Sequence, residues 1–173
     1  IKDRESQGLS AKPIENAGLV TELIEEIKSL NSINRKKALN LLIYNVLPGT
    51  TSAAHKKALF LREIILKENL IKEITEDFAF ELLSHMRGGP SVRVLLDIAL
   101  GEKKDLAKKA SQILKNQVFL YDSDIKRIET AFKQKNPIAK ELLESYSKAE
   151  FFTKLPDLNE EIKIVTYVAA EGD

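Results

Sequence analysis

Few residues of this chain belong to the types that catalyse reactions or bind metals. Among its 173 residues there are two histidines, His55 and His85, and no cysteine. Because thiolates hold iron–sulfur clusters and many zinc ions, the chain alone cannot provide a cysteine-ligated site of either kind. We interpret His55, beside Lys56 and Lys57, as a solvated residue. We interpret His85 as a helix-end residue, since a protonated imidazole suits the C-terminal end of a helix dipole.

Two short motifs share only part of the pattern of a ligand-binding loop. Asp122-Ser123-Asp124 resembles the start of a calcium loop, but the turn glycine and the glutamate at position twelve are missing. Gly88-Gly89 lacks the preceding strand and the Gly-Lys-Ser/Thr ending of a phosphate loop. We therefore expect the aspartates to cap a helix and the glycines to end one. No residue is assigned a catalytic, cofactor-binding or metal-ligating role.

Clusters of basic residues are the only indication of a polyanion-binding surface. They are Arg35-Lys36-Lys37, Lys56-Lys57, Lys103-Lys104 and Lys108-Lys109. The formal net charge of +1 excludes a strongly basic nucleic-acid clamp. Adjacent lysines are common on solvated helix faces, and most of these clusters lie near Asp or Glu. A solvated surface is the main interpretation, and RNA contact is the alternative.

Apolar residues recur with a helical period along most of the chain, which predicts about eight helices. The first buried stripe comprises Leu19, Val20, Leu23, Ile24, Ile27 and Leu30, and a later one includes Leu82, Leu83 and Met86. Residues that favour helix starts precede several of these segments: Ser52, Thr75, Ser91, Asp122, and Asn136 with Pro137.

The expected helices pair at intervals of roughly 32 to 38 residues, close to the lengths of helical-hairpin repeats. We predict an all-α, HEAT-like stack of antiparallel helix pairs, with a compact non-repeating bundle as the alternative. Residues 162–170 are β-branched or aromatic in large part and predict a strand. Since no second strand is evident upstream, this strand is expected to be an orphan that begins a further domain.

Several motifs, taken in order, resemble the N-terminal part of the aconitate hydratase B family. They are Gly8-Leu9 to Lys12-Pro13, Asn45-Val46-Leu47-Pro48-Gly49, Glu81-Leu82-Leu83 with Met86-Arg87-Gly88-Gly89, Ala149-Glu150-Phe151-Phe152, and residues 163–168. The chain departs from the family's pattern at Val46 and Pro90. The resemblance implies a HEAT-like domain at 1–153, a linker at 154–161, and the first strand of a truncated swivel domain at 162–173.

The resemblance also implies a function for the parent enzyme. The parent would be a cytoplasmic lyase that interconverts citrate and isocitrate through cis-aconitate and, in some members, handles 2-methylisocitrate. Its [4Fe–4S] cluster and catalytic residues would lie C-terminal to this piece, so no cofactor is expected here. The helical domain would contact other domains of the enzyme, a second copy or a protein partner. No membrane partner is expected, and an RNA-contacting module is the alternative.

Overall fold

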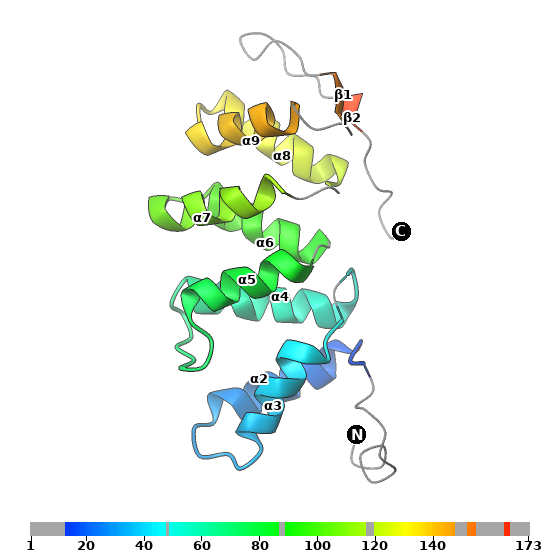
Figure 1. Ribbon diagram of the computed structural model, residues 1–173, viewed down its shortest axis with the longest axis vertical. Coiled ribbons are helices and arrows are strands. Elements are labelled where there is room, and N and C mark those ends of the chain that lie inside the picture. The colour runs from blue at the N-terminus through cyan, green and yellow to red at the C-terminus, as the bar shows by residue number, and fades with distance from the viewer. Residues whose placement is uncertain are drawn as a thin grey trace. The chain divides into compact units, whose positions relative to one another are not determined.

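A computed structural model describes residues 13–47, 49–86, 89–116, 120–147, 152–154 and 165–166. This part of the chain contains eight helices and two short strands, so the predicted all-α class is confirmed (Figure 1). The helices are α2 (Ala17–Lys28), α3 (Arg35–Tyr44), α4 (Ser52–Ile65), α5 (Glu76–Met86), α6 (Gly89–Ala99), α7 (Lys104–Leu114), α8 (Asp122–Lys133) and α9 (Pro137–Ser147).

The chain divides into two compact units, Ile1–Ser91 and Val92–Asp173. In the first, α2 packs against α3 and α4, and α4 packs against α5. In the second, α9 packs against both α7 and α8. Each unit therefore contains packed helices joined by short connections, as the pairing of apolar segments predicted. A continuous HEAT-like stack through both units stays a prediction.

Each amphipathic helix buries one face. In α2 the buried residues are Val20, Ile24 and Ile27, and in α5 the side chain of Leu83 is fully buried. Burial of apolar surface contributes roughly 25 cal/mol per Å², which makes these stripes the main source of stability. Leu19 and Leu30, expected in the α2 stripe, are instead exposed. Leu30 lies beyond the end of the helix at Lys28, and Leu19 lies off the buried face in its first turn.

Two of the predicted helix caps are present as hydrogen bonds. The hydroxyl of Thr75 accepts from the backbone N–H of Phe78 at 3.2 Å. The Oδ1 of Asn136 accepts from the backbone N–H groups of Ile138 and Ala139, at 2.9 and 3.2 Å. These bonds satisfy N–H groups that the first turn of a helix leaves without a helical partner.

Ser52 does not cap α4 as expected. Thr51 is the N-cap, and Ser52 is the first helical residue. The Oγ of Ser52 instead accepts from the N–H of Ala17 at 3.3 Å and donates to the carbonyl of Glu15 at 3.2 Å. The N–H of Ile14 also donates to the carbonyl of Asn45 at 2.8 Å. The segment before α2 is thus fixed to both α4 and the end of α3.

Ser91, like Ser52, was expected to be an N-cap and is instead a residue within the helix. The helix α6 begins two residues earlier, at Gly89, and Ser91 is buried inside its first turn. Pro90 is compatible with this position because the first turn of a helix does not need its missing N–H.

Two helices end at a lysine in the left-handed conformation. Lys67 after α4 has φ 62° and Lys135 after α8 has φ 65°. Beyond Lys135, the N–H of Asn136 donates back to the carbonyl of Ala131 at 3.0 Å. This bond is typical of a Schellman motif, in which glycine is the preferred left-handed residue.

The expected orphan strand has a partner, which corrects the sequence-based expectation. β1 (Phe152–Lys154) and β2 (Val165–Thr166) pair antiparallel, with Phe152 opposite Thr166 (Figure 1). Phe and Thr favour strands, although the resemblance to the family implies only that Phe152 marks the end of the helical domain. The rest of the strand expected at 162–170 and most of the linker at 154–161 lie outside the described residues, so the domain boundaries stay predictions.

Candidate functional site

The two histidines occupy the positions that the sequence predicted. His55 is exposed near the start of α4. His85 lies in the last turn of α5, exposed, with its Nε2 3.9 Å from a carboxylate oxygen of Glu81. Within the described part of the chain, no three His, Cys, Asp or Glu residues are close enough together to hold a metal ion. Neither histidine therefore belongs to such a cluster within the described residues.

The aspartates of the calcium-like motif lie in the first turn of α8. That helix begins at Asp122, as predicted. The buried carboxylate of Asp124 accepts from the backbone N–H of Tyr121 at 3.2 Å, so the capping interpretation is confirmed and the residue responsible is Asp124. In the other motif, the expectation that both glycines end a helix is wrong for Gly89, which begins α6 after α5 has ended at Met86. Gly88 lies outside the described residues.

The first basic cluster is partly used inside the protein. The Nη1 of Arg35 lies 2.6 Å from Oε2 of Glu73, and its Nε donates to the carbonyl of Ile27 at 2.9 Å. The hydrogen bond from the Arg35 guanidinium to the Glu73 carboxylate lowers the pKa of that carboxyl below its usual range, and the positive charge of Arg35 adds to the effect. Arg35 therefore joins α3 to the loop before α5 and does not belong to a free polyanion surface.

The second basic cluster also loses a member, because Lys57 is only 4% exposed. Its Nζ donates to the carbonyl of Ile43 at 3.1 Å, in the last turn of α3. Burial lowers the pKa of Lys57 from its ordinary value to about 8, since removal from water disfavours the charged amine. The sequence reading of Lys56-Lys57 as a paired surface cluster is therefore wrong.

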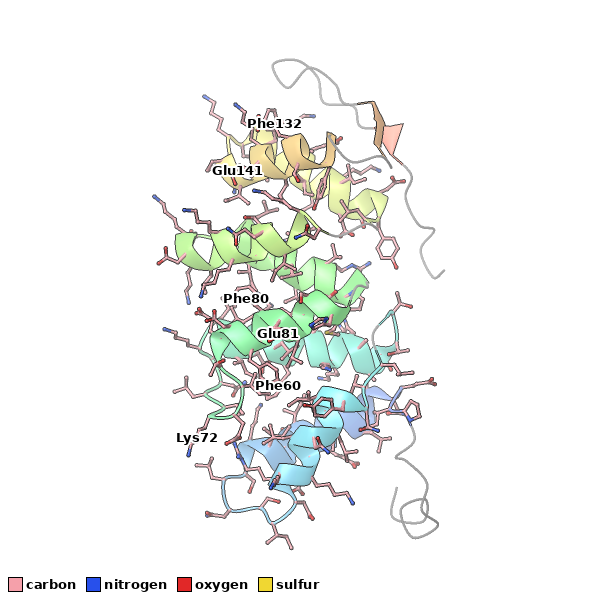
Figure 2. All side chains as sticks on the ribbon, in the orientation of Figure 1. Phe60, Lys72, Phe80, Glu81, Phe132 and Glu141 are labelled. Atoms are coloured by element: carbon pink, nitrogen blue, oxygen red, sulfur yellow. The ribbon has the colours of Figure 1, made fainter. Side chains whose placement is uncertain are left out.

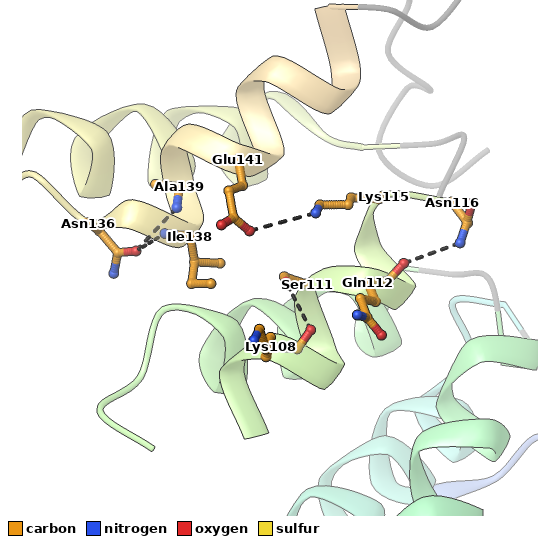
Figure 3. Close-up of polar contacts among 9 residues, drawn as sticks. All are labelled: Lys108, Ser111, Gln112, Lys115, Asn116, Asn136, Ile138, Ala139 and Glu141. Carbon is orange, nitrogen blue, oxygen red and sulfur yellow. Dashed lines mark hydrogen bonds and ion pairs between the residues drawn. The ribbon is translucent and has the colours of Figure 1, made fainter. Parts of the chain in front are cut away.

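The lysines of the last two clusters, by contrast, lie exposed at and along α7. They are Lys103, Lys104, Lys108 and Lys109. Lys104 and Lys108 are four residues apart, and hence on one side of the helix. Lys115, just after α7, lies 3.6 Å from the carboxylate of Glu141 in α9 (Figure 3). All four lysines of the last two clusters are therefore exposed at α7, whereas the first two clusters keep only Lys36, Lys37 and Lys56 exposed.

The sequence reading missed an exposed apolar surface on two loops of the first unit. Leu30 and Ile33 lie in the loop between α2 and α3 and are 78% and 96% exposed. Leu70 lies in the loop between α4 and α5 and is 83% exposed. We call Leu30, Ile33 and Leu70, with Lys67 and Lys72 of the second loop, the two-loop surface. One signal was present: Ile33 stands among turn-forming Asn and Ser residues, outside any helical stripe.

A shallow groove of about 360 Å³ opens at the second of these loops. Its apolar lining comes from Ile64, Leu70, Ile71 and Ile74. Lys67 and Lys72 also line it, and Figure 2 shows Lys72 pointing away from the helices. The groove thus combines aliphatic walls with two lysines and one glutamate, Glu76. None of the residues singled out from the sequence lies in this groove, apart from the helix cap Thr75.

The fold defines an all-α protein of packed helix pairs, whose described residues assemble no metal-binding cluster. A family model described as the aconitate B N-terminal domain matches residues 1–152. The chain belongs to this family.

Whole proteins in the comparisons carry the name aconitate hydratase B. The chain is 31% identical to that of Escherichia coli (strain K12) over 167 residues, which are 96% of this chain and 19% of the relative. It is 34% identical to that of Helicobacter pylori, with the same coverage. The chain therefore spans about a fifth of the length of these relatives. No helix in the part that the structure describes is long and apolar enough to cross a membrane.

Proposed function

We propose that this chain is the non-catalytic, N-terminal interaction domain of a larger aconitate hydratase B-type lyase. The observation that carries the proposal is the difference in coverage. The alignment with a relative of that name covers 96% of this chain but only 19% of the relative. The family-model match to residues 1–152 supports the N-terminal placement.

The proposed parent interconverts citrate and isocitrate through cis-aconitate, with 2-methylisocitrate dehydration as a further activity. Such a parent would use a [4Fe–4S] cluster, which cysteine thiolates hold. This chain has no cysteine, so the residues of the chain do not fit the cluster. The ligands of the cluster would come from elsewhere in the parent. We therefore propose that the chain contributes to the parent through contacts with other domains or proteins, and not through catalysis.

Helix pairs suit such a role because their connecting loops and outer faces stay available after the core has formed. In the first unit, the most exposed aliphatic side chains lie in such loops. The partners we propose are other domains of the same cytoplasmic enzyme, a second copy of the chain, or a separate protein.

A domain exchange tests the proposal. The corresponding N-terminal domain of the Escherichia coli relative is replaced by this chain and, as a matched control, by an unrelated helical domain of similar length. We expect the chain, but not the control, to restore the activity and oligomeric state that deletion of the domain removes. The purified chain alone should form no cis-aconitate from citrate, even after treatment with iron and sulfide. Activity of the chain alone would contradict the proposal, as would equal performance of the unrelated domain.

RNA binding is a second candidate function, favoured by the exposed lysines at α7. The test is the salt dependence of binding to a structured RNA, since each phosphate contact adds to the slope. Lys104→Glu with Lys108→Glu should weaken binding and flatten this slope, whereas the buried Lys57, replaced by Met, should leave the slope unchanged. An unaltered slope in the α7 variant would exclude this candidate.

A further inference from the structure

The segment that precedes α2 lies in an extended conformation against the end of α3. Ile14 and Val46 form a parallel β-bridge, and the N–H of Ile14 donates to the carbonyl of Asn45 at 2.8 Å. Figure 1 shows this segment, in dark blue, beside the chain that leaves α3. A short stretch of paired backbone therefore joins residues 13–15 to the connection between α3 and α4.

The same segment also provides an acceptor for the first turn of α4. The carbonyl of Glu15 accepts from the N–H of Ala53 at 3.4 Å and from the hydroxyl of Ser52 at 3.2 Å. Ala53 is the second residue of α4, so its N–H is one of the donors that a helix leaves without a helical partner. We call residues 13–15 the strap, and the residues that bind it the strap site. The strap site comprises Asn45, Val46, Ser52 and Ala53.

One side chain of the strap is buried. Ile14 is 3% exposed, whereas Pro13 and Glu15 on either side of it are exposed. This alternation is that of an extended chain, whose successive side chains point to opposite sides. The strap site thus binds one N–H, one carbonyl and one aliphatic side chain. Peptide recognition by strand addition works in this way, with backbone hydrogen bonds for affinity and side-chain positions for specificity.

The strap is held by few contacts. Ser52 is exposed, so water can replace the carbonyl of Glu15 at its hydroxyl. The conformational entropy lost on ordering the strap opposes the burial of Ile14 and the hydrogen bonds. Segments with few buried contacts open locally while the packed helices stay folded. We therefore expect the strap to open and expose the strap site without loss of the packing of α2 against α3 and α4.

Two large apolar side chains beside the strap site stay exposed while the strap is bound. Tyr44, which precedes Asn45, is 74% exposed, and Leu47, which follows Val46, is 41% exposed. They are distinct from the two-loop surface. A longer segment bound at the strap site gains affinity by burying these side chains, which the strap leaves in water.

We propose that the strap site binds an extended segment of a partner protein when the strap opens. The segment carries Ile or Val in the place of Ile14, donates the N–H of that residue to the carbonyl of Asn45, and presents the next carbonyl to the first turn of α4. Further apolar residues of the segment contact Tyr44 and Leu47. The inference rests on the proposed role as an interaction domain, for which it specifies a site and the chemistry of the partner segment.

A second copy of the chain is a less favourable source of the segment. The strap of a second copy already makes the same contacts in its own strap site, so an exchange between copies adds no contact there. Association also costs translational and rotational freedom, which new contacts must offset. A partner segment that has no strap site of its own breaks no such contacts when it binds.

The probe is a peptide that copies residues 12–16, Lys-Pro-Ile-Glu-Asn, titrated into the isotope-labelled 173-residue chain. We expect saturable shifts of the backbone amide signals of Val46 and Ala53 in NMR spectra. Replacing the Ile of the peptide by Ser should weaken binding at least about tenfold, because the buried side chain is lost. Methylating the backbone nitrogen of the same Ile should also weaken binding at least about threefold, because the donor to Asn45 is lost.

A second peptide tests the flanking apolar contacts. It carries an additional Leu at each end and should bind about threefold more tightly than the first peptide. In the chain, Tyr44→Ser with Leu47→Ser should remove this gain and leave the affinity for the first peptide within about twofold.

Variants of the strap test the competition. Ile14→Ser removes the buried side chain and should raise the affinity for the probe at least about fivefold, because the strap occupies its site for less of the time. Ile14→Asp should have the same effect, since a buried charge disfavours the bound strap further. Ile33→Ser is the matched control, because Ile33 is 96% exposed on another loop, and it should change the affinity by less than about twofold. Circular dichroism checks the fold, and if Ile14→Asp does not fold, the Ile14→Ser result decides.

A variant of the strap site locates the bound peptide. Combined with Ile14→Ser, Ser52→Ala removes a donor to the carbonyl of the peptide and should weaken binding about threefold. The control is Ser84→Ala in the same background. It removes a hydroxyl that donates to the carbonyl of Glu81 within α5, and binding should stay within about twofold.

Three results would overturn the inference. The first is the lack of saturable binding to every folded Ile14 variant. The second is equal binding by the unmodified chain and the Ile14→Ser variant, which would place the peptide outside the strap site. The third is a dimer of the unmodified chain that Ile14→Ser converts to a monomer without any peptide binding, which would indicate exchange of straps between two copies. These readouts do not depend on lyase activity, so a failure here is distinguishable from a failure of the domain exchange.

Discussion

Arg35 and Glu73 connect two loops that are far apart in the sequence, with 2.6 Å between the guanidinium Nη1 and the carboxylate Oε2. The same guanidinium donates from Nε to the carbonyl of Ile27, near the end of α2. A single side chain therefore fixes the end of α2, the start of α3 and the loop that precedes α5. Leu30 and Ile33 lie in the loop that ends at Arg35, and Leu70 lies in the loop that contains Glu73.

A double-mutant cycle with Arg35→Met and Glu73→Gln should measure this connection. We expect a coupling free energy of about 0.5–1 kcal/mol at low salt, because the pair is only partly exposed, and less at high salt. The control is the exposed pair Lys140–Glu144, at 4.0 Å, which should couple by about 0.3 kcal/mol. Because the pKa of Glu73 is lowered, its contribution should be present above the ordinary carboxyl pKa and disappear as the pH falls through the folded-state value. Equal coupling in the two pairs would contradict this prediction.

Leu83→Ala should destabilise the chain by about 2–5 kcal/mol, measured by denaturant unfolding. The reason is that Leu83 is fully buried in α5, so that truncation removes apolar contacts and leaves a cavity. Leu30→Ala makes the same chemical change on an exposed loop and should alter stability by less than about 0.5 kcal/mol. Similar losses in both variants would show that burial does not determine the effect.

Lys57→Met should change how stability depends on pH. The pKa of Lys57 falls to about 8 in the folded chain, from 10.5. Between these values the unfolded chain binds more protons than the folded one, so this lysine makes folding more favourable as the pH rises. The free energy of unfolding of the unmodified chain, relative to that of the variant, should therefore increase by about 2–3 kcal/mol from pH 7 to pH 10.5. If the difference in the free energy of unfolding stays constant with pH, the pKa of Lys57 is not lowered on folding, and the prediction is wrong.

Lys135→Gly should stabilise the chain by about 0.5–1 kcal/mol. Lys135 has φ 65°, a conformation that glycine adopts without the steric cost imposed by a Cβ atom. Lys133→Gly, two residues earlier within α8, should destabilise by a similar amount because glycine is unfavourable in a helix. Thermal unfolding of the two variants should thus shift in opposite directions. A shift in the same direction would mean that α8 ends elsewhere.

The regular parts of this fold were predictable because helix periodicity and capping act locally. The stripes that contain Ile24 and Leu83, and the caps at Thr75 and Asn136, follow from spacing and residue type. Ser52 shows the limit of such reasoning. Ser52 and Thr51 are equally good cap residues in sequence, and the choice between them depends on Glu15 and Ala17, which bind the hydroxyl of Ser52.

The candidate interaction surface depends on contacts that sequence spacing does not reveal. Lys57 is adjacent to an exposed lysine, yet it is buried, and its Nζ donates to the carbonyl of Ile43 near the end of α3. Leu30 continues the apolar period of α2, yet the helix ends at Lys28 and leaves it exposed. The groove beside Leu70 forms only when the α4–α5 loop folds back, so no linear pattern marks it.

The hydrogen bonds that attach the segment before α2 to α4 and to the end of α3 have a mechanical consequence. A pulling force applied at the N-terminal end would first load the bond from Ile14 to Asn45 and the bonds from Ser52 to Glu15 and Ala17. Helix ends ordinarily fray one residue at a time at little cost. Here α2 can begin to unwind only after contacts with α4 and with the end of α3 have broken. The first helix pair should therefore resist tension as a unit, and its rupture should appear as one abrupt step in a single-molecule extension trace.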